Sequence, residues 1–216
     1  MMLTFEQFTA KYIAEAVHPL DCAAGGYTHY EGGLWMKHRI ACWVQPQLIV
    51  ELGVRAGYTG WAMLVGVPGA KYIGFDSYLA GHADVKNVPD VQIIFKAHAE
   101  KIMSAFDAEV RVANTQDTGF GFSVPRADLY HVDAAHNYDC ARLDITNCLA
   151  AGDAHSIIAV HDFQAPLVQQ AALDAAKRAS SPVSVFEIPE PRNGDGLLFR
   201  GNAPEWLAEV DAQRLL

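Results

Sequence analysis

The chain has 216 residues, which suits one globular domain with a substantial core of its own. Its 51% hydrophobic and 19% charged residues are typical of a globular protein, and no apolar segment is long enough to cross a bilayer. The formal net charge of −9 disfavours nucleic acids and anionic membrane surfaces as partners, because binding to both depends largely on Lys and Arg.

The first residues carry Glu6 where a signal peptide needs positive charge, and no long apolar run follows. We therefore expect a cytoplasmic protein. The four cysteines have no C-x-x-C spacing, and a chain of this size needs no disulfide framework, so we expect reduced, structural thiols. These are Cys22, Cys42, Cys140 and Cys148.

The front of the chain predicts helices and a glycine-rich connection. Thr4 and Gln7 have capping-box spacing ahead of a helical pattern over 5–17. Residues 22–33 are too glycine-rich for a regular element, and 34–44 can form a helix. We expect 1–46 to be a helical segment that covers a pocket in 47–216, within a single domain overall.

From residue 47 the chain alternates strand-like and helix-like patterns. The predicted strands are 47–52, 71–76, 109–113, 127–133 and 155–161, and the predicted helices are 58–66, 92–106, 137–150 and 166–179. This alternation indicates an α/β fold, with a mostly parallel sheet covered by helices on both faces. Segments 182–189 and 196–200, joined by an Asn-Gly turn, predict a C-terminal antiparallel hairpin, and 78–90 a loop.

The most informative stretch is 47–59, where an apolar strand ends at Glu51-Leu-Gly-Val-Arg-Ala-Gly57 and a helix follows. Gly53 and Gly57 allow a tight turn and close approach of the backbone to a ligand, and the helix N-terminus presents unpaired N–H groups. The spacing Glu-x-Gly-x-x-x-Gly differs from the Gly-x-Gly-x-x-Gly of dinucleotide sites. The stretch therefore predicts a pocket for another kind of ligand.

Polar residues also follow other predicted strands, and ligands of open parallel sheets lie over those carboxyl ends. Asp76 ends the second strand, where an acid can accept hydrogen bonds from both ribose hydroxyls of an adenosine or cap a turn. Asp133 ends the fourth strand, and His136 follows three residues later. An imidazole, whose unperturbed pKa is about 6.5, is suited to accept a hydroxyl proton at neutral pH.

These segments together resemble class I S-adenosylmethionine (SAM)-dependent methyltransferases. The glycine turn is similar to their motif I and to the matching segment of catechol O-methyltransferases, whose Ala-Ser-Gln-Asp is similar to residues 114–117. Residues 133–138 resemble the Asp-Gly-x-His-x-Tyr motif of small-molecule and sugar O-methyltransferases. The resemblance implies a Rossmann-like class I methyltransferase fold, SAM as cofactor, and methyl transfer to a hydroxyl of a small molecule.

The resemblance also implies roles for single residues. The cofactor-binding residues would be Glu51, Gly53, Gly57, Thr59, Asp76, Thr115, Gln116 and Asp133. Asp133 and Asp162 would bind a divalent metal ion, and His136 would be the general base. His161 stands where the families have an acid; imidazole favours transition ions over Mg²⁺, so both the identity of the metal and the need for one stay open.

Three alternatives remain: a SAM-binding protein of this fold without turnover, an NAD-dependent oxidoreductase on a Rossmann sheet, and a metal-free methyltransferase that uses His136 alone. The glycine spacing and the acidic Glu51 argue against the oxidoreductase. On the helix after the fourth strand, Asp139 and Asp144 are expected to face solvent or to interact with the helix dipole. The sequence leaves open the methyl acceptor and whether the chain forms a homo-oligomer.

Overall fold

The computed structural model describes residues 2–17, 31–78, 91–117, 122–188, 194–210 and 213–214. The helices are α1 Phe5–Glu15, α3 Glu31–Val44, α4 Tyr58–Gly66, α5 Val91–Met103, α6 Tyr138–Ala151 and α7 Pro166–Arg178, with a 3-10 turn at Glu205–Glu209. The strands are β1 Leu48–Leu52, β2 Lys71–Asp76, β3 Ala108–Val112, β4 Leu129–Val132, β5 Ile157–Val160, β6 Val183–Ile188, β7 Asp195–Arg200 and β8 Gln213–Arg214. Residues 79–90 of the expected loop and the Asn-Gly turn at 193–194, apart from Gly194, lie outside the described residues.

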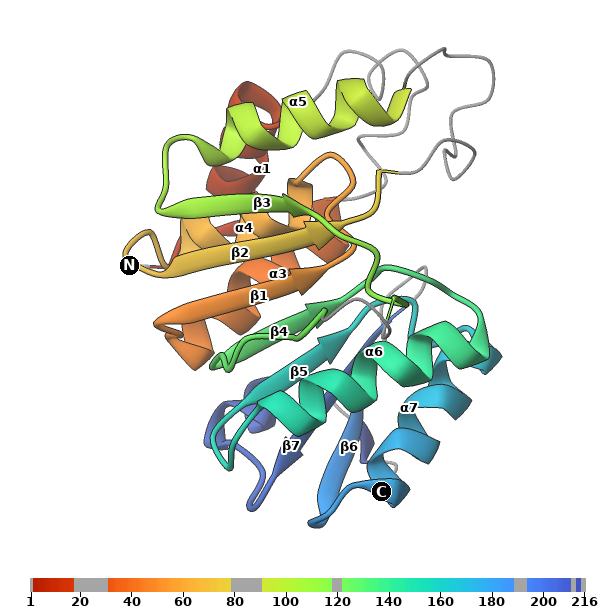
Figure 1. Ribbon diagram of the computed structural model, residues 1–216. Helices are drawn as coiled ribbons and strands as arrows, with labels where there is room; N and C mark the ends of the chain where they lie inside the picture. Colours follow the sequence, from red (N-terminus) through yellow and green to blue (C-terminus); the bar gives the residue numbers. More distant parts are fainter. Residues whose placement is uncertain are drawn as a thin grey trace.

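The strands form one sheet in the order β3-β2-β1-β4-β5-β7-β6-β8 (Figure 1). The first five are parallel, β7 pairs antiparallel with β5, and β6 and β7 form the expected antiparallel hairpin. After β3, at one edge, the chain returns to the middle of the sheet, where β4 lies beside β1. Ligands of sheets of this kind bind at such a switch point, here between β1 and β4. The predicted fold class is confirmed.

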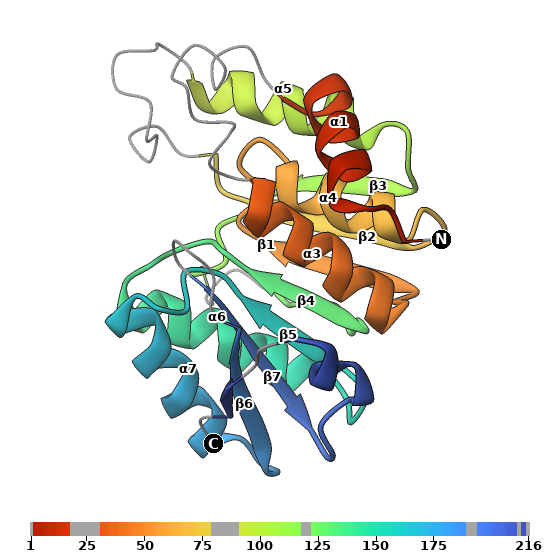
Figure 2. The same ribbon diagram turned by 180° about the vertical axis from the view of Figure 1, so that it is seen from behind.

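Helices cover both faces of the sheet. Alternate residues of each strand point to opposite sides, so both faces carry apolar side chains that the helices bury. Figure 1 shows α6 and α7 on the near face, and Figure 2 shows α1 and α3 on the other. Ile49, Leu129 and Leu197 belong to the core cluster under α1, α3 and α4, whereas Val50 and Val132 belong to the cluster under α6 and α7. By the same alternation, polar strand residues in step with Ile49 and Leu129 point to the face that α3 covers.

The front segment forms part of this core. The Thr4–Gln7 capping box is present, as predicted. The prediction that 22–33 is irregular is wrong at its end, because α3 begins at Glu31 and includes Gly32, where a Cβ atom would have nothing within 4 Å. Packing of the buried side of α3 against α4 outweighs the low helix propensity of glycine.

The expectation about the cysteines can be checked at three of the four. Cys42, Cys140 and Cys148 are free, and Cys22 lies outside the described residues. Burial raises the pKa of the Cys148 thiol well above its ordinary value, which fits a structural residue. Among the helices that the structure describes, none has the length and apolar character needed to traverse a bilayer.

Candidate active site

A cavity of about 770 Å³ lies at the carboxyl ends of the parallel strands. Most of the residues singled out from the sequence line it. These are Gly53, Thr59, Asp76, Thr115, Gln116, Asp133, His136, His161 and Asp162. Two predicted cofactor-binding residues, Glu51 and Gly57, are not part of this lining.

The glycine turn is shaped by close backbone packing. Gly53 has a φ of 95°, and a Cβ there would lie 2.3 Å from the main-chain oxygen of Asp133. Gly57 caps α4 with a φ of 82° and no side-chain hydrogen bond, and its Cβ would lie 3.0 Å from Ala99. Both positions therefore need glycine. Gly57 does so for packing against α5, while Gly53 brings the end of β1 against the end of β4.

Glu51 is placed differently from the expectation, because its side chain is buried inside the sheet layer. The Tyr72 hydroxyl donates a hydrogen bond to one carboxylate oxygen, and His131 Nδ1 lies 3.1 Å from the other. Burial, together with Glu51, raises the pKa of Tyr72 well above its ordinary value. Glu51 thus connects β1 to β2 and β4 beneath the cavity and is not among the residues that line it.

Asp76 lines the cavity and also caps a turn. One carboxylate oxygen accepts the Arg55 N–H at 2.7 Å, and the other accepts the Tyr78 N–H at 2.8 Å. Each oxygen keeps a second acceptor position. The two interpretations of Asp76 are therefore compatible: the carboxylate is fixed by backbone donors and can still accept hydrogen bonds from a ligand.

Asp144 was expected to face solvent or the helix dipole, and the first of these is wrong because the side chain is fully buried. Gln116 Nε2 donates to Asp144 Oδ1 at 3.0 Å and to Thr115 Oγ1 at 3.1 Å. Burial raises the pKa of Asp144 to about 6, although hydrogen bonds from Thr115 and Gln116 oppose the shift. Asp144 therefore holds the two polar residues that line this end of the cavity.

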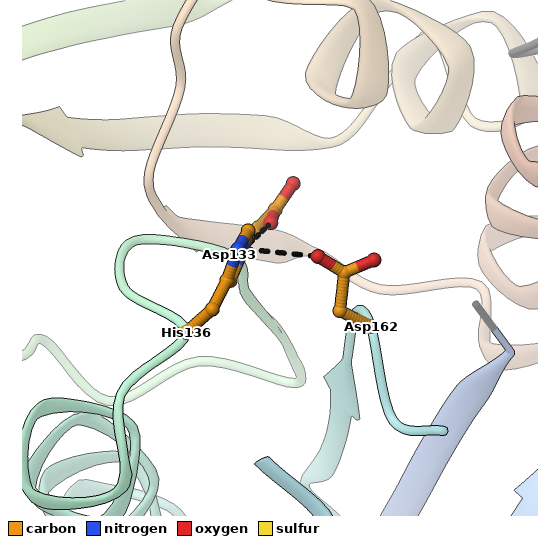
Figure 3. A group of neighbouring side chains, drawn as sticks. All are labelled: Asp133, His136 and Asp162. Atoms are coloured by element: carbon orange, nitrogen blue, oxygen red, sulfur yellow. Dashed lines mark hydrogen bonds and ion pairs between the residues drawn. The ribbon is translucent and has the colours of Figure 1, made fainter. Parts of the chain in front are cut away.

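At the opposite side of the cavity, Asp133, His136 and Asp162 form an Asp-His-Asp cluster (Figure 3). His136 Nε2 lies 3.2 Å from Asp133 Oδ1 and 3.1 Å from Asp162 Oδ2, and the three ligand atoms lie within 4.8 Å of one another. Burial raises the pKa of Asp133, but the nearby histidines, His161 first, lower it by more, to about 2. Asp133 is therefore ionised at neutral pH.

Asp162 has two further features of a functional group. Its φ of 52° is unusual for a residue other than glycine, and such strain is found most often at functional sites. Its Oδ1 atom is buried and accepts no hydrogen bond from the part of the chain that the structure describes. A buried carboxylate oxygen without a donor is costly, which favours an occupant that is not part of the protein.

His161 lies beside this cluster and contacts a buried ion pair. Its Nδ1 atom is 3.2 Å from Lys37 Nζ on α3 and 3.4 Å from Asp195 Oδ1 on β7. Lys37 Nζ lies 2.5 Å from each oxygen of Asp195. No role was predicted for Lys37 or Asp195 from the sequence. The burial of Lys37 could have been predicted, because it lies between Leu34 and Ala41 on the apolar side of the helix.

Fold and cavity together are those of a class I methyltransferase. A family model described as a methyltransferase domain matches residues 50–163, which is more than half of the chain. The chain therefore belongs to this methyltransferase family, as the resemblance of its motifs implied. A search of curated proteins gives no match.

Solved structures show the same fold. Cofactor-bound Rv0187 from MTB is 14% identical, with a TM-score of 0.60 over 90% of this chain and 95% of that one. TomG, an O-methyltransferase from Streptomyces achromogenes, is 15% identical, with a TM-score of 0.57 over 93% of this chain and 100% of its own. An O-methyltransferase from Bacillus cereus is 12% identical, with a TM-score of 0.56 over 90% and 88% of the two chains.

Proposed function

We propose that this protein is a SAM-dependent O-methyltransferase that methylates a hydroxyl group of a small molecule, with the help of a divalent metal ion. The observation that carries the proposal is that the glycine turn and the Asp-His-Asp cluster line one cavity. The TomG structure contains SAM and the Bacillus cereus structure contains SAH, the demethylated product, which supports the same cofactor here.

The cofactor end of the cavity fits an adenosine and an amino-acid group. Gly53 lines this part of the cavity, and its lack of a Cβ lets the end of β1 lie against the Asp133 main chain. Asp76 is fixed by two backbone N–H groups and can accept hydrogen bonds from the ribose. Thr115 and Gln116, held by Asp144, would contact the adenine. Bound SAM supplies an electrophilic methyl group on a sulfonium sulfur.

The donor set of the Asp-His-Asp cluster fits a divalent cation. Asp133 is ionised, and the buried Asp162 Oδ1 is available as a ligand atom. If His136 is the third ligand, one imidazole among carboxylates suits Mn²⁺, Fe²⁺ or Co²⁺ at least as well as Mg²⁺. A bound ion would lower the pKa of an acceptor hydroxyl by Lewis-acid polarisation.

In the proposed reaction, His136 Nε2 accepts the proton of the acceptor hydroxyl, whose oxygen forms the new bond to the methyl carbon as the bond from sulfur to that carbon breaks. The products are a methyl ether, SAH and a proton on His136, which is later released to solvent. His136 is exposed, which allows this release. The same nitrogen cannot be a metal ligand and a base at once, so a second candidate role for His136 is that of the third ligand.

The cofactor proposal is tested by thermal unfolding with SAH, SAM or NAD. A ligand that binds only the native state raises the melting temperature. SAH and SAM should do so and NAD should not. Stabilisation by NAD alone would instead favour the oxidoreductase.

The metal proposal is tested by chelation in a methyl-transfer assay, with isotope-labelled SAM and a panel of phenolic and sugar hydroxyl acceptors. Chelation should abolish transfer, and Mn²⁺, Co²⁺ or Fe²⁺ should restore it. Full activity after chelation, and equally in Asp133→Ala, would place the protein in the metal-free class. SAH binding without transfer to any acceptor under any metal would favour the SAM-binding protein without turnover.

A further inference from the structure

The buried ion pair between Lys37 and Asp195 lies directly beside the proposed metal site. The two side chains are 3% and 0% exposed, and they join α3 to β7 across the end of the sheet. Burial raises the pKa of Asp195, but Lys37 and His161 lower it by more, so that the pKa lies well below its ordinary value. Such a pair costs desolvation free energy, and apolar residues of similar size often stabilise a fold at least as well. A purely structural role therefore explains it poorly.

The geometry around His161 gives the pair another role. An ammonium group is only a donor, so a hydrogen bond from Lys37 Nζ to His161 Nδ1, 3.2 Å away, needs a lone pair on that nitrogen. The proton of the neutral ring then lies on Nε2. The competing arrangement, in which Nδ1–H donates to Asp195, has the longer distance of 3.4 Å and brings that hydrogen toward the Lys37 ammonium group.

The other ring nitrogen faces the metal site. His161 Nε2 lies 3.5 Å from Asp162 Oδ1, the buried oxygen that receives no hydrogen bond in the described part of the chain. Protein groups that donate to a metal-binding carboxylate fix its orientation and tune its affinity for the ion. A proton on Nε2 would be donated to Asp162 Oδ1 and would orient the carboxylate. The second lone pair of Oδ1 would stay available for the ion.

We infer that Lys37, anchored by Asp195, is a positioning residue: it keeps His161 Nδ1 unprotonated, so that the Nε2–H group points at Asp162 and orients this carboxylate. His161 then donates a hydrogen bond to a metal ligand and is not itself a ligand of the metal. The inference rests on the proposed function for its metal, and on the distances around His161 for the position of the proton.

The position of the proton can be measured without metal, cofactor or acceptor. Long-range ¹⁵N–¹H NMR of labelled histidine distinguishes the two neutral tautomers, and the His161 signals are identified by their loss in His161→Gln. Burial and Lys37 lower the pKa of His161, but Asp133 and Asp195 together raise it by more, so the spectra must be recorded at a pH high enough for a neutral ring. We expect Nε2–H in the wild type. A wild-type ring protonated at Nδ1 would overturn the inference.

The variant Lys37→Met removes the donor and leaves Asp195, so the His161 proton should move to Nδ1 and donate to Asp195. Lys71→Met is the matched control, because this lysine is 71% exposed and pairs with the exposed Asp107. It should leave the His161 signals unchanged. A ring that keeps Nε2–H in Lys37→Met would show that Lys37 does not set the tautomer.

The effect on Asp162 is read from Mn²⁺ affinity, measured by electron paramagnetic resonance. Lys37→Met should raise the Kd about tenfold or more, the usual effect of losing a group that orients a ligand. If this variant does not fold, Lys37→Met combined with Asp195→Leu removes the pair without leaving a buried charge and should raise the Kd similarly. An unchanged Kd in a folded variant would overturn the positioning of Asp162. A wild type that binds no Mn²⁺ would refute the metal proposal instead, and the tautomer would then decide the inference.

Discussion

Replacement of Asp144 by Asn should stabilise the protein at neutral and alkaline pH. The pKa of this buried carboxyl is raised from its ordinary 3.8 to about 6. The fold therefore favours the protonated form. The resulting stabilisation is fully present below pH 3.8 and is lost as the pH rises through about 6. A difference of about 2 pKa units corresponds to roughly 3 kcal/mol of unfolding free energy.

An Asn side chain has nearly the same shape, stays neutral, and can still accept the hydrogen bond from Gln116 Nε2 through its oxygen. The side chain is fully buried, so no large part of the effect should be screened by solvent. We expect Asp144→Asn to raise the unfolding free energy by about 1–3 kcal/mol at pH 8, with a much smaller gain below pH 5.

Urea unfolding of the wild type and the variant at several pH values measures this difference. Asp139→Asn is the matched control, because Asp139 is exposed in the first turn of the same helix and should lose only a helix-dipole contribution of about 0.5 kcal/mol. A gain that does not change with pH, or a loss of stability at pH 8, would refute the assignment of a raised pKa to Asp144.

Three further substitutions test the cavity. Gly53→Ala should lower the unfolding free energy by about 3 kcal/mol or more, because Gly53 has a φ of 95° and the new Cβ would lie 2.3 Å from Asp133. The control Gly69→Ala, with open space around it, should have little effect. Equal effects of the two substitutions in urea unfolding would contradict this prediction. Asp76→Ala should weaken SAH binding in calorimetry about tenfold or more through lost hydrogen bonds, and unchanged affinity would remove the ribose role. His136→Gln should lower kcat by about 10²–10⁴ with the Mn²⁺ Kd unchanged if His136 is the base. A raised Mn²⁺ Kd in this variant would instead show that His136 is a metal ligand.

The sheet and its helices could be predicted because both have a clear pattern. The strands of the parallel part have four to six residues, and most of them are largely apolar. The helices between the strands repeat their apolar residues at helical spacing. The polar residues at the strand ends could be predicted for the same reason, since every parallel strand delivers its carboxyl end to one edge of the sheet.

What could not be predicted depends on contacts between distant parts of the chain. Glu51 and Asp133 both follow an apolar run, but only the pleat decides that Glu51 turns beneath the cavity, toward Tyr72 and His131. The start of α3 was missed because packing on α4 outweighs local propensity there. Asp144 could have been recognised as buried, since it shares an apolar side of its helix with Ala141, Ile145 and Cys148.

The ion pair between α3 and β7 also bears on how the molecule folds. Lys37 and Asp195 are 158 residues apart in the sequence, so their contact closes a loop of nearly three quarters of the chain. The entropy cost of closing this loop must be met before the contact forms, and topologies with many distant contacts fold slowly. The glycine turn and β4 can come together while this loop is still open. The side of the cavity lined by His161 and Asp162 is therefore expected to be the last part to gain its native structure, and the first to lose it when the hairpin detaches.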